Sequence, residues 1–309
     1  MMKINQPIEK ISPLTPNELD KYHFGETEWL MNFSNFHHLF HINRLEEIIT
    51  KIKFPILPHR KTVYDFIFLT EGNSIRSKGL HQYNFSKNTF FFLPAFQIST
   101  HEYLSDNARG YYCHFDSDIF NNLFMQKSFF EKFPFLHFLS KPTVEISEAM
   151  LLPILHIMER LENEYQSNKP LNANLVSAYL LALFTELNLV EVPNRENSKN
   201  SAQRITEKFN NLLSINIYKT NKVAEYASML AVTPDYLNKC VKSTMGKTSQ
   251  ELLADMIILE AKVLLKQTNL SISEIAFKFS ETNPSDFSRF FKNKTKLAPK
   301  DFRQMADFQ

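Results

Sequence analysis

The last hundred residues contain one short unit twice, and this duplication constrains the fold more than any other feature. In each copy, a short helix, predicted at 223–230 and again at 275–279, is followed by a tight turn and a second helix. The core positions Leu237 and Phe287 of these second helices are 50 residues apart. Two short helices joined by a tight turn form a helix-turn-helix, so the sequence predicts two such units in tandem.

The start signals of the second helices repeat as well. Thr233 and Asn283 each precede a proline. A capping side chain followed by proline at the first helical position marks a helix start. We therefore expect second helices at 235–242 and 285–292.

The flanking helices are also predicted from local signals. Asn221 is the expected cap of the first short helix, and Ser271 with Glu274 predicts a capping box before the other. A long helix at 250–266 is expected to join the two units, because its apolar residues recur at helical spacing.

The outer faces of the two second helices have the residue types that read DNA. Leu237 and Val241 are expected to face inward on the first helix, and Phe287, Phe290 and Phe291 on the second. Asparagine can pair with adenine, and arginine or lysine with guanine. The outward positions are Asp235, Asn238, Lys239, Lys242, Ser285, Arg289, Lys292 and Asn293.

The charge of the chain is distributed to match. Residues 201–309 carry 16 lysines and arginines against 11 acidic residues, whereas residues 1–200 carry 19 against 22. A basic terminal region beside a mildly acidic one predicts phosphate binding at one end of the chain only.

The same region resembles a known family. The segment 271–303, SISEIAFKFSETNPSDFSRFFKNKTKLAPKDFR, resembles the C-terminal signature of the AraC/XylS family of bacterial transcription regulators. The first unit, through Leu237 and Met245-Gly246-Lys247, is similar to the first motif of that family. The resemblance covers about 100 of the 309 residues. The front part matches only in type, since such regulators often carry a cupin-like β sandwich and helices there for sensing and dimerisation.

The resemblance implies roles for individual residues. Base contacts fall on Asp235, Asn238 and Lys239 of the first recognition helix and on Ser285 and Arg289 of the second. Phosphate contacts fall near Thr233, Asn283 and Lys292, and Lys242 is expected on the same surface. Asp235 would repel phosphates unless it accepts a hydrogen bond from cytosine.

Four positions depart from the usual residues of the family. Ala231 and Ser280 stand where the inter-helix turns often have glycine, Glu281 replaces an aromatic residue, and Lys296 replaces the glycine before the final proline-containing loop. A non-glycine residue in the left-handed conformation costs roughly 1–2 kcal/mol. We therefore expect a second unit that is less regular or binds phosphate less tightly.

The front of the chain is rich in strand signals. β-Branched and aromatic runs predict short strands at 63–70, 74–76, 81–85, 89–93 and 110–115. Spacings of about 10 residues between short strands are typical of an antiparallel sandwich or barrel. Several strands are apolar on both faces, so both faces are expected to be covered.

Two longer helices, predicted at 148–166 and 171–190, lie between the strand-rich front of the chain and the helix-turn-helix units. The polar segment after them shows no hydrophobic periodicity. Because a long apolar stripe needs a partner surface, the two helices are expected to form a dimer contact. The predicted fold is therefore α+β and multidomain. Its regions are a cupin-like sensing domain at 1–145, a helical dimerisation region at 146–190, a linker at 191–203 and a double helix-turn-helix DNA-binding domain at 204–309.

Composition excludes several other classes. The five glycines are isolated, which argues against nucleotide-binding folds, and the two cysteines, Cys113 and Cys240, cannot build a disulfide framework or a zinc knuckle. No signal peptide and no membrane span are predicted. We expect a cytoplasmic protein without a membrane partner.

The function that these features favour is sequence-specific regulation of transcription by a protein that is not an enzyme. The expected partners are double-stranded DNA and a second copy of the chain, with RNA polymerase and an unidentified small effector as further candidates. No cofactor, metal or catalytic residue is predicted. Activation and repression are both left open.

One alternative is a metal-dependent cupin-type enzyme with a helical assembly tail. His37 and His41 are four residues apart, but no matched acidic ligand accompanies them. A further alternative keeps DNA binding and assigns the front domain to dimerisation alone.

Overall fold

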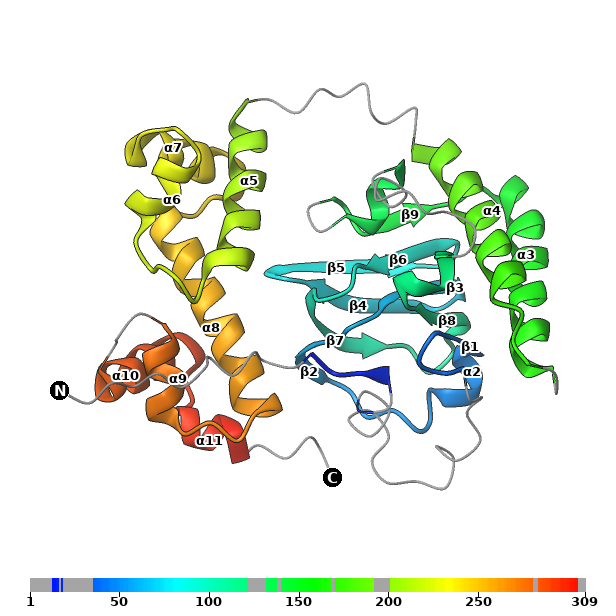
Figure 1. The fold of residues 1–309 in the computed structure, drawn as a ribbon, viewed down its shortest axis with the longest axis horizontal. Coiled ribbons are helices and arrows are strands. Elements are labelled where there is room, and N and C mark those ends of the chain that lie inside the picture. Colours follow the sequence, from blue (N-terminus) through cyan, green and yellow to red (C-terminus); the bar gives the residue numbers. More distant parts are fainter. Residues whose placement is uncertain are drawn as a thin grey trace.

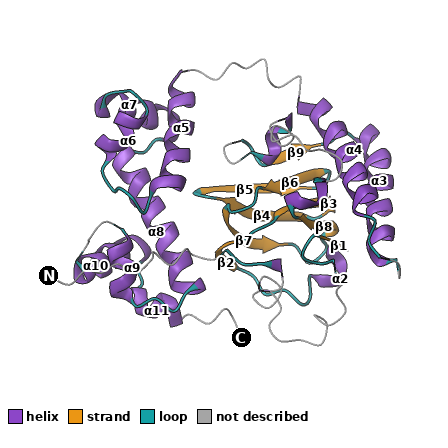
Figure 2. Cartoon of the chain, in the orientation of Figure 1, coloured by secondary structure: helices purple, strands orange, loops and turns teal. Residues whose placement is uncertain are grey.

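The computed structural model describes residues 13–16, 18, 36–121, 132–137, 140–167, 170–191, 201–279 and 283–304. It consists of a front domain with two β sheets and a helical domain formed by the last hundred residues (Figure 1). The five-stranded sheet has the order β1-β8-β3-β6-β9 and the four-stranded sheet the order β2-β7-β4-β5, with antiparallel pairing within each. The predicted α+β layout is confirmed, and Figure 2 shows how strands and helices segregate.

The strands follow the predicted ones closely where a prediction was made. β6 has the predicted bounds, while β3, β4, β5 and β8 extend or shift by one to three residues. β1, β2, β7 and β9 were not predicted. The bounds are β1 (Phe40–Arg44), β2 (Ile56–Arg60), β3 (Tyr64–Glu71), β4 (Asn73–Lys78), β5 (His81–Ser86), β6 (Thr89–Leu93), β7 (Ile98–Leu104), β8 (Arg109–Phe115) and β9 (Thr143–Glu145).

Phenylalanines cover both faces of the larger sheet, as expected from the pattern of β3 and β6. Phe66 and Phe68 of β3 pair with Phe92 and Phe90 of β6, and the rings of Phe68 and Phe90 stack with centroids 4.1 Å apart. These side chains belong to a core shared with two long helices. The opposite face, which includes Phe91, belongs to a separate apolar cluster. The sheet is thus buried on both sides.

The two long helices are α3 (Glu148–Gln166), which has the predicted bounds, and α4 (Ala173–Glu191). They lie on the side of the front domain opposite to the helical domain (Figure 1). The buried residues of α4 are Val176, Leu180, Leu183, Phe184 and Leu187. The other apolar residues of α4 lie on its more exposed face and include Leu175, Ala178, Leu181, Ala182 and Leu189.

The segment Ala173–Val190 of α4 is long and apolar enough, by length and composition alone, to cross a membrane. The core helix of a soluble protein passes the same test, and the buried residues of α4 pack in the core of the front domain. This helix is therefore weak evidence for a membrane span.

The helical domain begins at Ser201, inside the segment 191–203 that was expected to be a linker; residues 192–200 lie outside the described residues. Its first helix was not predicted, whereas the long helix α8 extends the predicted one by one residue at each end. The bounds are α5 (Ser201–Asn216), α6 (Val223–Met229), α7 (Pro234–Met245), α8 (Ser249–Gln267), α9 (Ile272–Lys278), α10 (Pro284–Thr295) and α11 (Pro299–Gln304).

Candidate nucleic-acid interface

Two helices of equal length occupy equivalent places at opposite ends of α8. α7 and α10 contain 12 residues each and lie on the side of α8 away from the sheets (Figure 1). Thr233 Oγ1 accepts a hydrogen bond from the backbone N–H of Tyr236 (3.2 Å), and Asn283 Oδ1 accepts one from Ser285 (2.9 Å). The predicted start signals are confirmed, and both helices run three residues past their predicted ends.

Equivalent side chains anchor the two helices. Leu237 and Val241 of α7 and Phe287 and Phe291 of α10 are almost fully buried, whereas Phe290 is half-buried. The helices are thus held by the same positions of the repeat, as the spacing of 50 residues predicted.

The shorter helices preceding them differ in their starts. The capping box of Ser271 and Glu274 at α9 is confirmed. The prediction that Asn221 caps α6 is wrong, because Lys222 is the cap residue and makes no side-chain cap bond. Asn221 Nδ2 instead donates to the backbone carbonyl of Phe279, 3.3 Å away, so it links the first unit to the second.

Most of the predicted contact residues lie on the exposed face of their helix. Thr233 and Asn283 are exposed as well, with their side-chain oxygens used in the caps. Their assignment to bases or phosphates stays a prediction. The exposed residues of the recognition helices include Asp235, Lys239, Lys242, Ser285, Arg289 and Lys292.

Asn238 differs from the other predicted contacts. It is half-buried, and its Oδ1 accepts from the backbone N–H and the hydroxyl of Ser249, at 3.0 and 3.2 Å. Ser249 is the first residue of α8. Asn238 therefore ties α7 to the start of the linking helix, a role that the sequence pattern did not indicate.

Two exposed side chains on the same face were not predicted. Tyr236 is 42% exposed, and Asp286 occupies the equivalent position in α10. Arg289 Nη2 donates to Asp286 Oδ1 over 3.1 Å. Because both side chains are mostly exposed, this ion pair is weak and leaves Arg289 able to exchange partners. Tyr236 and Asp286 each lie three residues before a predicted contact, Lys239 or Arg289, so helical spacing would have found both positions.

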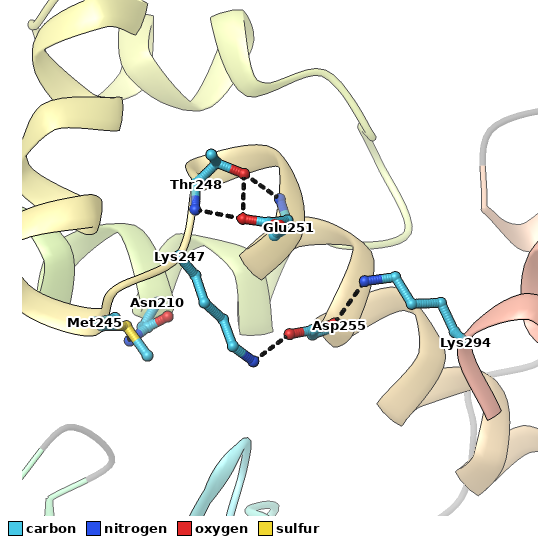
Figure 3. A network of polar contacts seen from close by, with 7 residues as sticks. All are labelled: Asn210, Met245, Lys247, Thr248, Glu251, Asp255 and Lys294. Atoms are coloured by element: carbon cyan, nitrogen blue, oxygen red, sulfur yellow. Dashed lines mark hydrogen bonds and ion pairs between the residues drawn. The ribbon is translucent and has the colours of Figure 1, made fainter.

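A single carboxylate on α8 connects the ends of the two recognition helices. Lys247, which follows α7, donates to Asp255 Oδ2 (2.6 Å), and Lys294 in the last turn of α10 donates to Asp255 Oδ1 (3.1 Å) (Figure 3). Hydrogen bonds and the positive charges of both lysines outweigh partial burial and lower the pKa of Asp255. The two units are thus joined through α8 by a charged contact on each side.

Positive backbone φ angles occur where the family resemblance expects glycine. Ala231 has a φ of 54°, and Lys296, the C-cap of α10, has a φ of 67°, nearly the 69° of Gly246 at the C-cap of α7. Lys296 therefore carries a side chain in a conformation that favours glycine. Ser280 and Glu281 lie outside the described residues.

The histidines of the front domain form a compact group. The ring centroid of His37 lies 4.6 Å from that of His41 and 4.8 Å from that of His114. Burial, together with His37, lowers the pKa of His41 to about 3, so its imidazole is neutral at physiological pH. In the described part of the chain, no group of three or more His, Cys, Asp or Glu side chains is placed to hold a metal ion.

A cavity of about 310 Å³ lies between the front domain and the first helix-turn-helix unit. The front domain contributes Lys78, His81 and Lys141 to its lining, and the helical domain contributes Asn210 and Met245, among others. The side-chain ammonium of Lys78 donates to two backbone carbonyls, and burial lowers its pKa to about 7.

Residues 226–305, which include both recognition helices, match a protein family model described as a helix-turn-helix domain. The chain carries an AraC-type helix-turn-helix domain. The predicted resemblance to the AraC/XylS family is confirmed for this part of the sequence.

Curated relatives match about half of the chain. The transcriptional activator RhaS of Klebsiella pneumoniae is 24% identical over 168 residues, covering 52% of this chain and 57% of that protein. RhaS of Escherichia coli K12 is 26% identical over 156 residues, covering 48% and 52%. The chain thus spans about half the length of the curated relatives it matches.

Solved structures resemble the chain at low scores. ToxT of Vibrio cholerae is 15% identical with a TM-score of 0.40, covering 86% of this chain and 98% of that one. An AraC-type regulator of Chromobacterium violaceum is 22% identical with a TM-score of 0.33, covering 35% and 97%. These scores are too low to establish a shared overall arrangement.

Proposed function

We propose that this protein is a sequence-specific, DNA-binding transcription regulator that places α7 and α10 in successive major grooves. The observation that carries the proposal is the pair of equally long, equivalently capped helices at the two ends of α8. Successive major grooves on one face of DNA are about 34 Å apart, and a linking helix holds two readers at a fixed separation. The name of the curated relatives, transcriptional activator, supports the same function.

The base-contacting residues in this proposal are Asp235 and Lys239 of α7 and Ser285 and Arg289 of α10, with Lys242, Lys292 and the two cap residues near phosphates. Asn238 is assigned to holding α8, because its side-chain oxygen is used by Ser249.

Selection of binding sites from a random-sequence duplex library tests the proposal with the full chain. We expect enriched duplexes with two short subsites about 10 base pairs apart. The double variant Lys239→Ala, Arg289→Ala should lose the enrichment. A wild-type chain that binds all duplexes equally would overturn the proposal.

We assign dimerisation to the outer faces of α3 and α4. Leu152 and Leu189 are 61% and 63% exposed there, on the side of the front domain away from the recognition helices (Figure 1). The pair Leu152→Glu, Leu189→Glu should convert a dimer to a monomer in sedimentation. Ile215→Glu is the matched control, because Ile215 is 68% exposed but lies on α5.

We assign the candidate effector site to the cavity that Lys78 lines. A thermal-shift screen tests this assignment. A ligand at 100 times its dissociation constant should raise the free energy of unfolding by about 2.7 kcal/mol. Contact with RNA polymerase stays a prediction. None of the relatives described above is an enzyme by name, so they lend no support to the metal-dependent alternative.

A further inference from the structure

The middle of α8 carries a buried carboxylate with one partner from each domain. The side chain of Glu260 is 1% exposed. Arg60 Nη2, at the end of β2 in the front domain, donates to Glu260 Oε1 over 2.6 Å. Tyr218 Oη, which follows α5 in the helical domain, donates to Glu260 Oε2 over 2.6 Å. Each oxygen of the carboxylate is thus used by a different part of the chain.

Tyr218 also contacts the second helix-turn-helix unit. Its ring stacks on Phe279, the C-cap residue of α9, with centroids 5.5 Å apart and an interplanar angle of 27°. Phe279 in turn stacks on Phe287, the buried anchor of α10, at 6.1 Å. The contacts of Glu260 therefore extend from the front domain through Tyr218 to the second recognition helix.

Burial makes these contacts strongly dependent on one another. A buried carboxylate needs charged or hydrogen-bonding partners, and removal of one partner leaves the charge uncompensated. Burial and the neighbouring Glu260 raise the pKa of Tyr218, so its hydroxyl keeps its proton and remains a donor. β2 lies beside α8 (Figure 1), and Ile98 of the front domain is buried in the helical-domain core. The front domain is therefore docked where this carboxylate lies.

We propose that Glu260 and Tyr218 are positioning residues for α10, and that Arg60 makes this positioning depend on the docking of the front domain. The inference rests on the proposed DNA-binding function and deepens it. The hydroxyl of Tyr218, fixed by Glu260, sets where its ring supports Phe279 and hence the orientation of α10 relative to α7. Arg60 holds the other oxygen of the same carboxylate in place.

The test measures how strictly the full chain requires one spacing between the two subsites of a selected duplex. Affinities are compared for that duplex and for one with a single base pair inserted between the subsites. Tyr218→Phe keeps the aromatic ring but removes the hydroxyl, and Glu260→Gln removes the charge. We expect each to reduce the affinity ratio of the two duplexes about tenfold, the scale of a hydrogen bond to a charged group.

Arg60→Met is expected to reduce the ratio in the same direction, with Arg60→Lys restoring part of it. The double variant with Tyr218→Phe should show a smaller loss than the sum of the two single losses, because both residues act through Glu260. Arg44→Met is the matched control, since it breaks an arginine–glutamate pair to Glu162 (2.7 Å) within the front domain. That variant should keep the wild-type ratio.

The outcomes separate the two proposals. Affinity for a duplex with only the subsite read by α7 reports that the first unit is folded in each variant. A wild-type ratio in Tyr218→Phe, an equal loss in Arg44→Met, or additive effects of Arg60→Met and Tyr218→Phe would overturn the inference alone. Failure of the wild-type chain to select any site would instead overturn the proposed DNA-binding function.

Discussion

The two helix-turn-helix units share a frame but differ in the side chains placed on it. Their recognition helices have equal lengths, polar caps followed by proline and buried anchors at matching positions. On the exposed face, Lys239 of the first corresponds to Arg289 of the second, and Tyr236 corresponds to Asp286. The comparison indicates that caps and core spacing determine where each helix lies. Under the proposed function, the outer residues differ because each helix reads a different subsite.

The largest expected effect comes from the anchors. Leu237→Ala and Phe287→Ala should lower the free energy of unfolding by about 2–5 and 3–5 kcal/mol, because each removes a buried side chain. Hydrogen exchange at α7 and α10 locates the loss, which we expect to be greatest in the unit that carries the change. Phe277→Ala is the control, since Phe277 is 58% exposed, and an equal loss in that variant would contradict the prediction.

The next contrast concerns DNA affinity. Arg289→Ala is expected to lose about 1–3 kcal/mol with relaxed preference at one base pair, because arginine can contact guanine with two hydrogen bonds. Lys239→Ala should relax the preference at its own base pair less strongly, since lysine presents a single charged group rather than the two-pronged donor of arginine. Competition between duplexes that differ at single positions measures both effects. Unchanged binding by Arg289→Ala would remove this residue from the interface.

Asp286→Asn provides a companion variant for the same experiment. It removes a negative charge from the exposed face of α10 and releases Arg289 from its ion pair. Binding should therefore become tighter, and most strongly at low salt. Weaker binding would show instead that the pair orients Arg289 for its contact.

The C-caps of the two recognition helices share a left-handed conformation but differ in residue, Gly246 in α7 and Lys296 in α10. Lys296→Gly should stabilise the second unit by roughly 1–2 kcal/mol, because lysine is disfavoured at a φ of 67°. Gly246→Ala should destabilise the first unit by a similar amount; a Cβ there would meet nothing within 4 Å, so only the backbone conformation opposes it. Thermal unfolding measures both, and shifts of the same sign would contradict the prediction.

The smallest effect is expected from the two capping boxes, at Thr248 with Glu251 and at Ser271 with Glu274. Hydrogen bonds from the cap residues lower the pKa of both glutamates from the usual 4.5. Their stabilisation is therefore fully present above pH 4.5 and is lost as the pH falls through the lowered values. Glu251→Gln and Glu274→Gln should flatten the pH dependence of hydrogen exchange in α8 and α9. A slope unchanged by either variant would contradict this assignment.

Local signals explain why much of the helical domain could be predicted. Polar residues before proline located the starts of α7 and α10, and the capping box located that of α9. In the front domain, β6 was found because four of its five residues are consecutive and apolar, and all five are buried. In β7, by contrast, two of the buried positions are occupied by the polar residues Ser99 and His101. Its sequence therefore lacks the apolar alternation that marks a strand.

The sequence by itself determined the paired helix-turn-helix units, their anchors and most of the exposed faces, because these features depend on caps and periodicity within a few residues. Only the tertiary structure decided which face of α4 is buried, that Asn238 holds Ser249, and that Asp255 joins two lysines from different units. Arg60 and Glu260 are 200 residues apart in the chain. No local pattern specifies such a pair, because its stability comes from the docking that removes both groups from water.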